Sequence, residues 1–360
     1  MHPLAPWGFD AAFQAAFAPF ASEGLVPGRV VEEQRDLLQV VTPDRTVPCT
    51  VGGRLRHEAR GRLAVPVVGD FVAVTAPPAP GGGRGVVRAV LPRRSLLVRK
   101  SAGETGEPQP IAAGLDVVLV ATSANHDFNE RRLERYVTVS WESGAQPVVL
   151  LTKADLVPEI DALVARAEAA APGVPVIAVS AATGQGLDAL STHLAPGRTA
   201  ALVGSSGVGK STLVNRLLGV DLLATRPVSE HEDKGRHTTT SRRLLALPTG
   251  ALLVDTPGMR ELGLCEDDGG LETAFADVGE LARRCKFKDC AHDTEPGCAV
   301  RSALETGALD PDRWASYGKL RRELAYLARR DDPAAMAAEN ARWRRKVAEN
   351  ERWRRATGAQ

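Results

Sequence analysis

The sequence predicts three consecutive modules: a small all-β barrel, a parallel α/β sheet with helices on both faces, and a helical C-terminal module. Runs rich in β-branched residues, broken by Gly, Pro and Asp, fill residues 29–98 and indicate about five strands. From about 111 to 264 apolar strands alternate with helical segments, which is typical of a parallel sheet covered by helices. After residue 271 no strand pattern remains, and three of the five cysteines gather between 285 and 298.

Composition agrees with a folded multidomain chain. Of the 360 residues, 44% are hydrophobic and 25% are charged, which argues against a wholly disordered chain. No apolar run reaches about 18 residues, and the first ten residues lack the pattern of a secretory signal, so we expect a cytoplasmic protein without a membrane partner. The expected parts are an N-terminal helical extension (1–28), the barrel (29–100), the α/β domain (101–268), the cysteine-bearing module (269–335) and a basic tail (336–360).

The first part begins with a short helix that carries an aromatic face. Its aromatic residues recur three or four positions apart, and packing on the helix's own domain is favoured over binding of a partner. The strands that follow fit a five-stranded Greek-key barrel, the OB-fold, which often binds oligonucleotides. Composition alone does not separate this barrel from an SH3-like one. A Pro/Gly-rich loop or hairpin is expected at 76–85.

The α/β domain is predicted from short, continuous apolar runs, which suit strands buried on both faces. Strands are expected at 115–121, 147–152, 174–179, 199–203 and 251–254, and helices at 129–142, 158–171, 186–194 and 210–218.

The strongest motif, GSSGVGKST at 204–212, matches G-x-x-x-x-G-K-[ST] between an expected strand and an expected helix. Its glycines let successive backbone N–H groups point inward at phosphate oxygens, and the helix N-terminus adds a positive dipole. Lys210 can reach the β- and γ-phosphates, and the Ser211 hydroxyl can ligate Mg²⁺. The expected phosphate-binding residues are Gly204, Ser205, Ser206, Gly207, Val208, Gly209, Lys210, Ser211 and Thr212.

A second motif, Asp255-Thr-Pro-Gly258, lies 44 residues after Ser211 and follows another apolar strand. An aspartate in that place can hold Mg²⁺ through water, and Gly258 can meet the γ-phosphate. Together with the preceding loop this spacing indicates a nucleoside triphosphate site that uses Mg²⁺.

Two segments predict that the site binds guanine and not adenine. Thr152-Lys-Ala-Asp155 resembles the [NT]-K-x-D motif, in which Asp155 accepts hydrogen bonds from guanine N1 and the exocyclic amine while Lys153 lies along the base. Ser180 and Ala181 follow the next strand and fit the segment that supports the base through a backbone N–H. Both segments precede the phosphate loop, whereas they follow it in ordinary GTPases, so the sequence predicts a circularly permuted GTPase domain.

A polar stretch at 229–243 has the position and composition of a switch loop. Thr238 and Thr239 are both candidates for a further Mg²⁺ ligand, and the residues do not choose between them. Met259 stands where many GTPases place a water-orienting glutamine, so slow intrinsic hydrolysis is expected. His237 is the candidate catalytic residue that positions water, with a purely structural role as the alternative.

The cysteine cluster has the spacing of a metal site, Cys285-x₄-Cys290-x-His292-x₅-Cys298. Four such ligands within fourteen residues suit one tetrahedral Zn²⁺, and since the protein fills all four positions the ion should be structural. Three reduced cysteines beside an unrelated histidine are the alternative. The acidic residues Asp289, Asp293 and Glu295 are expected to be solvated or to lie outside the ligand shell.

The last 43 residues carry 12 basic and 6 acidic side chains with Trp343 and Trp353 interleaved. Arginine and tryptophan stack on bases, so the segment suits RNA, with a solvated helix laced by Glu–Arg pairs as the alternative.

These motifs, in this order, resemble the RsgA (YjeQ/YloQ) family of bacterial, circularly permuted GTPases of small ribosomal subunit biogenesis. Further similar segments are Gly69-Asp70, Arg132-Leu-Glu-Arg-Tyr136 and Cys285-Lys-Phe-Lys-Asp-Cys290, and the resemblance spans roughly 30–330. It implies an OB-fold, a permuted GTPase domain, a zinc domain and GTP hydrolysis stimulated by the 30S subunit. His237 matches the histidine proposed as catalytic, whereas Thr152 stands where asparagine is usual.

The sequence is therefore interpreted as a monomeric GTPase that binds GTP and GDP, the 30S subunit and 16S rRNA, with Mg²⁺ at the nucleotide and one Zn²⁺. Three alternatives stay open. One is an rRNA-binding assembly factor that holds GTP with negligible turnover. The others are an ATP-dependent enzyme and a permuted GTPase of the large subunit.

Overall fold

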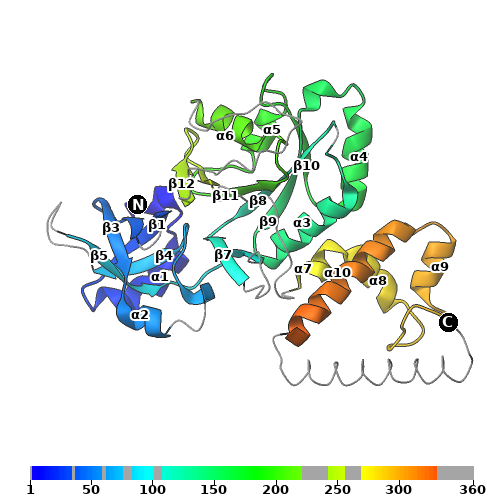
Figure 1. Cartoon of the computed structure of the whole chain (residues 1–360), viewed down its shortest axis with the longest axis horizontal. Helices are drawn as coiled ribbons and strands as arrows, with labels where there is room; N and C mark the ends of the chain where they lie inside the picture. Colours follow the sequence, from blue (N-terminus) through cyan, green and yellow to red (C-terminus); the bar gives the residue numbers. More distant parts are fainter. Residues whose placement is uncertain are drawn as a thin grey trace, which may run out of the picture.

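The computed structural model describes residues 2–34, 37–58, 62–75, 83–100, 108–125, 127–220, 242–255 and 269–330. Figure 1 shows the barrel and the C-terminal helices on opposite sides of the central α/β domain. Within these residues no helix is long and apolar enough to cross a membrane. The three modules predicted from the sequence are thus present in the predicted order.

The barrel is closed and has the OB-fold topology. Its strands are β1 (Val26–Gln34), β2 (Leu37–Val41), β3 (Thr46–Val51), β4 (Phe71–Thr75) and β5 (Gly85–Val90). They follow the order β1-β2-β3-β5-β4, and a β1–β4 pairing closes the ring. The β3–β5 pair is parallel and the others are antiparallel. This order confirms the OB-fold rather than an SH3-like barrel. Helix α2 (Gly53–Glu58) and the 3-10 turn η2 (Arg62–Ala64), which the sequence did not predict, lie between β3 and β4.

The N-terminal helix packs on the barrel, as expected. A 3-10 turn, η1 (Ala5–Trp7), precedes α1 (Ala11–Ala21), and the Asp10 side chain caps α1 by accepting from two backbone N–H groups. The buried Phe13 ring lies 4.3 Å, between centroids, from Phe71 of β4. The aromatic face is therefore part of the barrel's own core.

The α/β domain contains a mainly parallel sheet. Its strands are β8 (Val117–Ser123), β9 (Gln146–Thr152), β10 (Val176–Val179), β11 (Thr199–Gly204), β12 (Arg242–Ala246) and β13 (Leu252–Asp255). Their order is β10-β9-β8-β11-β13-β12, with only β12 antiparallel to its neighbour. The chain starts near the centre, builds one half outward to β10, and returns to the centre with β11. The five predicted strands are confirmed, whereas β12 was missed.

Helices cover both faces of this sheet. Helices α3 (Glu130–Glu142) and α4 (Ile160–Ala170) pack in one apolar core, and α5 (Leu187–Ser191) and α6 (Lys210–Leu218) pack in a second. Side chains alternate between these cores along β8, with Val118 and Val120 in the first and Val117 and Leu119 in the second. All four helices were predicted from the sequence.

Strand pairing joins the barrel to the α/β domain. Strand β1 pairs with β12, so both modules share one continuous sheet of eleven strands. Beside it lies a separate hairpin of β6 (Leu96–Lys100) and β7 (Pro108–Ala113). Arg29 of β1 is 1% exposed and donates to backbone carbonyls of Trp7, Gly69 and Gly114 and to the Thr199 hydroxyl. Burial lowers its pKa to about 10, so it stays cationic at neutral pH.

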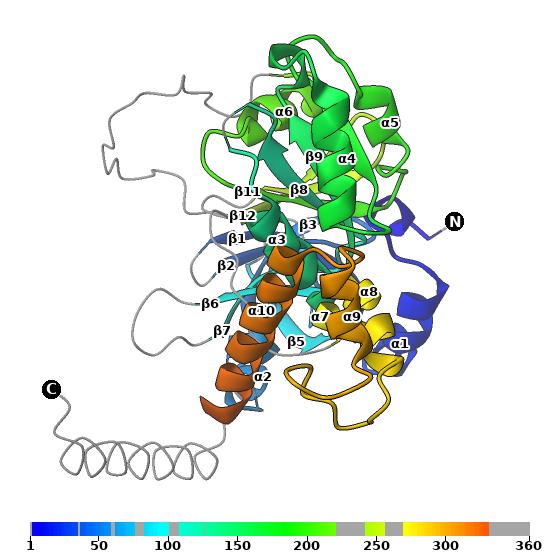
Figure 2. The ribbon, with the colours of Figure 1, turned by 90° about the vertical axis from the view of Figure 1, so that its right-hand side faces the viewer.

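Every secondary-structure element described in the C-terminal module is a helix, as predicted, and the non-helical segment 284–298 carries the cysteine cluster. The module contains the short helices α7 (Gly270–Ala274), α8 (Ala276–Arg283) and α9 (Ala299–Glu305) and the long helix α10 (Pro311–Arg330). Helices α7 and α10 contact α3 of the α/β domain, and Figure 2 shows α10 running in front of α3. Arg313 of α10 is 6% exposed and contacts Glu134 of α3 and Asp277 of α8. The module is thus anchored on α3 by a buried arginine.

Candidate nucleotide-binding site and metal centre

The predicted nucleotide segments meet at one edge of the sheet. Strand β8 pairs in parallel with β9 on one side and with β11 on the other, which makes it a point where the strand order reverses. Parallel sheets bind ligands in the crevice outside the carboxyl ends of the strands at such a point. Thr152, Ser180, Gly204 and Asp255 end or follow four parallel strands there, although they are far apart in the chain.

Glycines give the phosphate loop its shape. Gly204 has φ +143°, and a Cβ at this position would lie 2.1 Å from the carbonyl oxygen of Ala121 in β8. Gly209, with φ +95°, caps α6, which begins at Lys210. The Lys210 ammonium donates to the carbonyl of Gly204 at 2.7 Å, so its side chain lies along the loop. The loop therefore needs glycine at both places and places a cation beside a helix N-terminus.

Thr152 ties the base-recognition segment to the phosphate loop. Its side chain is 4% exposed, and its hydroxyl lies 2.5 Å from the carbonyl of Val208 and 3.2 Å from that of Thr122. A hydroxyl has one proton, so the shorter contact marks the acceptor. The sequence suggested Thr152 only for contact with the base. Its hydrogen bond to Val208 was not predicted, because it depends on β9, β8 and β11 lying side by side.

The neighbouring residues shape the rim of the crevice. Lys153 has φ +58°. A Cβ added to Gly209 would lie 4.0 Å from the Cε atom of Lys153, so the aliphatic part of the lysine side chain lies beside the phosphate loop. Asp155 is exposed in the 3-10 turn η3 (Ala154–Leu156). Ser180 is 1% exposed and its hydroxyl accepts from the N–H of Thr183, which folds the turn that carries Ala181.

Two oxygen donors suitable for Mg²⁺ come from adjacent strands. Strands β11 and β13 pair in parallel, so Ser211, just beyond the loop after β11, and Asp255, the last residue of β13, belong to the same sheet edge. Hydroxyl and carboxylate oxygens are the hard ligands that Mg²⁺ prefers. Burial raises the pKa of Asp255, and the charge of Arg243 partly opposes this effect.

The predicted switch residues His237, Thr238 and Thr239, together with Gly258 and Met259, lie outside the described residues, as does the basic tail 336–360.

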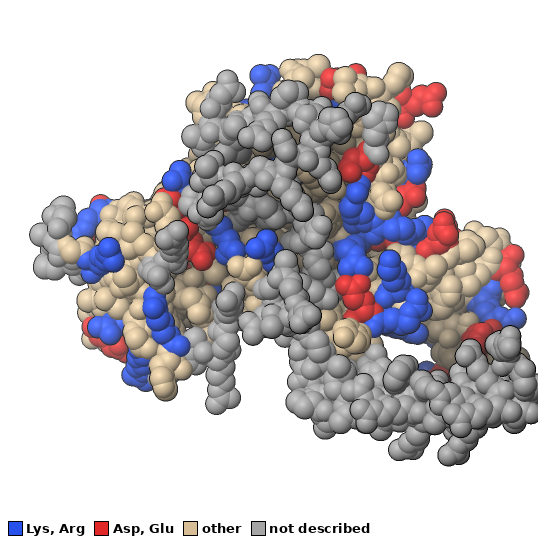
Figure 3. All heavy atoms as spheres, viewed as in Figure 1, with Lys and Arg blue, Asp and Glu red and all other residues tan. Residues whose placement is uncertain are grey.

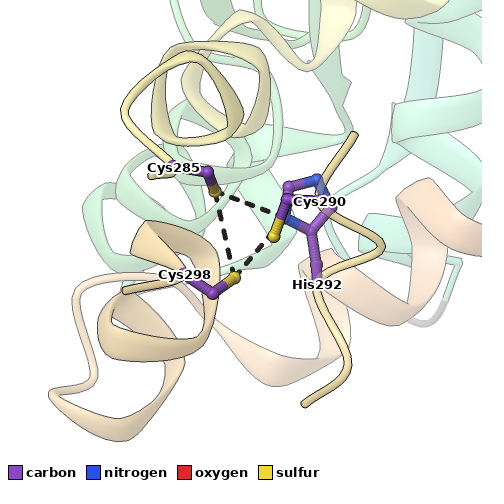
Figure 4. Close-up of side chains that lie close together, drawn as sticks. All are labelled: Cys285, Cys290, His292 and Cys298. Carbon is purple, nitrogen blue, oxygen red and sulfur yellow. Dashed lines mark hydrogen bonds between the residues drawn. The ribbon is translucent and has the colours of Figure 1, made fainter. Parts of the chain in front are cut away.

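The cysteine cluster converges on one point (Figure 4). The ligand atoms of Cys285, Cys290, His292 and Cys298 all lie within 4.8 Å of one another. The Cys285 and Cys298 sulfurs are 3.9 Å apart, and each lies 3.5 Å from His292 Nδ1. Tetrahedral bonds of about 2.3 Å to sulfur and about 2.0 Å to nitrogen place such ligands about 3.5–3.8 Å apart. The arrangement suits one metal ion, as the spacing predicted.

Local structure holds these ligands in place. Cys298 caps α9 by accepting from the N–H of Arg301, and the Glu295 carboxylate accepts three backbone N–H groups of residues 291, 293 and 294. Burial, then the nearby charge of Arg321, lowers the pKa of His292, which favours the neutral imidazole that binds a metal. Glu295, expected to be solvated or outside the ligand shell, organises the loop that carries His292.

Known proteins resemble the chain over most of its length. The model of the RsgA GTPase family matches residues 90–265. The small ribosomal subunit biogenesis GTPase RsgA of Opitutus terrae is 48% identical over 95% of both chains, and that of Streptomyces avermitilis is 46% identical over 96% of this chain and 92% of the relative. The crystal structure of YjeQ from Thermotoga maritima has a TM-score of 0.62 and 27% identity, covering 84% of this chain and 99% of that one.

Proposed function

The chain belongs to the RsgA GTPase family, and on that basis we propose that it hydrolyses GTP to GDP and phosphate on the 30S ribosomal subunit, during late maturation of that subunit. The observation that carries the proposal is the meeting of four segments at one sheet edge, in permuted chain order. The curated relatives, 45–48% identical over nearly the whole chain, are named as small-subunit biogenesis GTPases.

In the proposed site the loop 204–212 holds the phosphates, with Lys210 at the β- and γ-phosphates. Asp155 accepts from guanine N1 and the exocyclic amine, Lys153 lies along the base, and the turn at Ser180 and Ala181 supports it. Ser211 and Asp255 would hold Mg²⁺, the latter through water, with Thr238 or Thr239 and Gly258 completing the γ-phosphate side. When bound, Mg²⁺ neutralises charge on the phosphates.

The catalytic step has one candidate residue. His237 is proposed to position the attacking water, because Met259 has no group that can orient it. Stimulation by the 30S subunit would then act by placing His237 against the attacking water.

The metal in the cysteine cluster is proposed to be a structural Zn²⁺. Three thiolates and one imidazole are ligands that Zn²⁺ favours, and four protein ligands leave no open position for catalysis. The ion would join α8 to α9 and fix the loop between them.

The partner on the ribosome is proposed to be 16S rRNA. Within the metal-bearing loop Phe287 is 42% exposed, and the Lys286 ammonium lies 5.6 Å from its ring centre, with Lys288 beside it. Exposed rings with flanking cations stack on unpaired bases. Figure 3 shows further Lys and Arg side chains, with Asp and Glu among them, along the border between the α/β domain and the C-terminal helices. We further propose a monomer that acts in the cytoplasm.

GTP turnover by the purified chain, alone and with 30S or 50S subunits, tests the proposal. Stimulation by 30S subunits alone supports it. Stimulation by 50S subunits points instead to a large-subunit factor. GTP binding without stimulated turnover points to an rRNA-binding assembly factor that holds GTP passively, and it removes His237 from catalysis.

A further inference from the structure

Three charged side chains from two modules form a row across the sheet. Glu32 of β1 lies opposite Arg243 of β12, and Arg243 lies opposite Asp255 of β13. Residues directly opposite one another in antiparallel pairs project from the same face. Arg243 therefore stands between a carboxylate of the barrel and a carboxylate of the α/β domain.

Arg243 makes its described hydrogen bonds with the barrel. Its Nε and Nη2 atoms each lie 2.8 Å from Glu32 Oε1. The Glu32 side chain is 18% exposed and that of Arg243 is 48% exposed, so the pair lies at the rim of the interface. On its other side Arg243 lies directly opposite Asp255 of β13, so its guanidinium charge stands one strand away from that carboxylate. Arg243 is thus within electrostatic reach of Asp255 while Glu32 holds it.

The position of Arg243 bears on the proposed Mg²⁺ site. When a carboxylate pairs with a guanidinium, its negative charge is offset and its lone pairs are no longer free to accept from a metal-bound water. In addition, the nearby cation repels Mg²⁺. Asp255 therefore serves Mg²⁺ best when Arg243 is held by another anion. Glu32 is that anion, and it belongs to the barrel.

We propose that Glu32 is a positioning residue for the Mg²⁺ site: by holding Arg243 it keeps the guanidinium away from Asp255, so that docking of the barrel on β12 sets the Mg²⁺ requirement of nucleotide binding. The inference rests on the proposed function in one respect, the assignment of Asp255 to Mg²⁺. Separation of β1 from β12 would release Arg243 toward Asp255 and weaken the hold on Mg²⁺-nucleotide.

The test is the binding of a fluorescent GDP analogue, titrated with Mg²⁺, by the full chain and its variants. Glu32→Gln frees Arg243 and is expected to raise the Mg²⁺ concentration at half-effect by about threefold, the scale of a rim ion pair. Arg243→Gln removes the competing cation and is expected to keep that concentration at or below the wild-type value. The double variant should behave as Arg243→Gln alone, because Glu32 acts only through Arg243.

A matched control comes from the next pair on the same strands. Glu33 and Arg242 are also paired in register, with 3.2 Å between Oε2 and Nη1, but they project from the opposite face. Glu33→Gln removes an equivalent pair between β1 and β12 and is expected to leave the Mg²⁺ requirement unchanged. Thermal melting of each variant shows whether the modules stay folded.

A raised Mg²⁺ requirement in Glu32→Gln, together with a requirement at or below the wild-type value in Arg243→Gln, supports the proposal. Shifts in the same direction, or an equal shift for Glu33→Gln, overturn it, because general loosening of the interface then explains the result. Should Glu32→Gln not fold, a raised Mg²⁺ requirement in Arg243→Gln overturns it alone. Wild-type binding that ignores Mg²⁺ removes the Asp255 assignment and this inference together, whereas Mg²⁺-dependent binding unchanged in Glu32→Gln removes only the inference.

Discussion

The hydroxyl of Thr152 donates to the backbone carbonyl of Val208 at 2.5 Å, which joins the end of β9 to the phosphate loop across 56 residues of sequence. The side chain is 4% exposed, so water does not replace the bond. Leaving a buried carbonyl without a donor costs about 1–3 kcal/mol. The segment proposed to recognise the base and the loop proposed to hold the phosphates are therefore coupled before any nucleotide binds.

Thr152→Val tests this coupling, because valine keeps the shape and removes the donor. The affinity for GDP is expected to fall about tenfold, since the loop relaxes when the Val208 carbonyl loses its partner. Thr152→Ser keeps the hydroxyl and should bind like the wild type. Equal affinities for Val and Ser at this position, measured with a fluorescent analogue, would mean that the loop holds its shape without the bond.

Asp155→Asn should change the base that the site accepts. Guanine offers two N–H donors to the carboxylate, and an asparagine cannot accept from both, so GTP affinity is expected to fall about a hundredfold. Xanthine has a carbonyl in place of the exocyclic amine, and the asparagine amide can donate a hydrogen bond to this carbonyl. XTP should therefore bind the variant better than it binds the wild type. Competition of GTP, XTP and ATP against one labelled nucleotide measures this. An unchanged order of preference would make the guanine assignment wrong and favour an ATP-dependent enzyme.

The sequence predicts most of the α/β domain because its strands and helices each carry their own signal. The strand at 117–123 is a continuous apolar run, and the loop 204–212 is recognisable from its glycines and lysine. Strand β12 was missed because it starts with Arg242 and Arg243, whose partners Glu32 and Glu33 lie in another module. The Thr152–Val208 bond was missed for the same reason: it exists only once β9, β8 and β11 lie side by side. Local pattern thus predicts elements, while contacts between distant elements need the strand order.

Removal of the metal should unfold the loop between α8 and α9. The purified chain is expected to carry one Zn²⁺, and Cys290→Ala should lose it and melt at a lower temperature, because the free energy of metal binding at these four ligands contributes to the stability of the folded loop. Cys49→Ala, which removes a buried cysteine of the barrel, is the matched control and should retain the metal. Metal analysis and melting curves read out both. Full metal content in Cys290→Ala would place the ion elsewhere.

Arg313 should be the most sensitive contact between the C-terminal helices and α3. It donates to Asp277 at 2.7 Å, to Glu134 at 3.3 Å and to the carbonyls of Ala170 and Ala274. Arg313→Met leaves these acceptors without their buried donor, and it is expected to lower the free energy of unfolding by about 3–5 kcal/mol. The half-exposed Arg301 pairs with Glu305 at 3.4 Å, and Arg301→Met should change stability by less than about 0.5 kcal/mol. Urea unfolding compares the two, and similar losses would contradict a special role for Arg313.

The buried thiol of Cys49 should make the folded protein less stable at alkaline pH. The side chain is fully buried in β3, and burial raises the pKa of its thiol to about 11 from an ordinary value of 9.0. Between these values the unfolded chain releases the thiol proton and the folded chain does not, so rising pH favours unfolding. Below pH 9 both states keep the proton and the group adds no pH dependence. The full effect is about 2–3 kcal/mol, because each pKa unit corresponds to about 1.4 kcal/mol.

Cys49→Ala isolates this contribution, since every other alkaline titration is common to both proteins and cancels in the difference. The variant is expected to be less stable than the wild type at pH 7, because a smaller side chain leaves space in the barrel core. Urea midpoints taken from pH 7 to 11 should then show the gap constant up to pH 9 and narrowing above it, since only the wild type carries a buried thiol that resists ionisation. A gap that stays constant to pH 11 would mean that the folded barrel lets the thiol ionise as readily as the unfolded chain does.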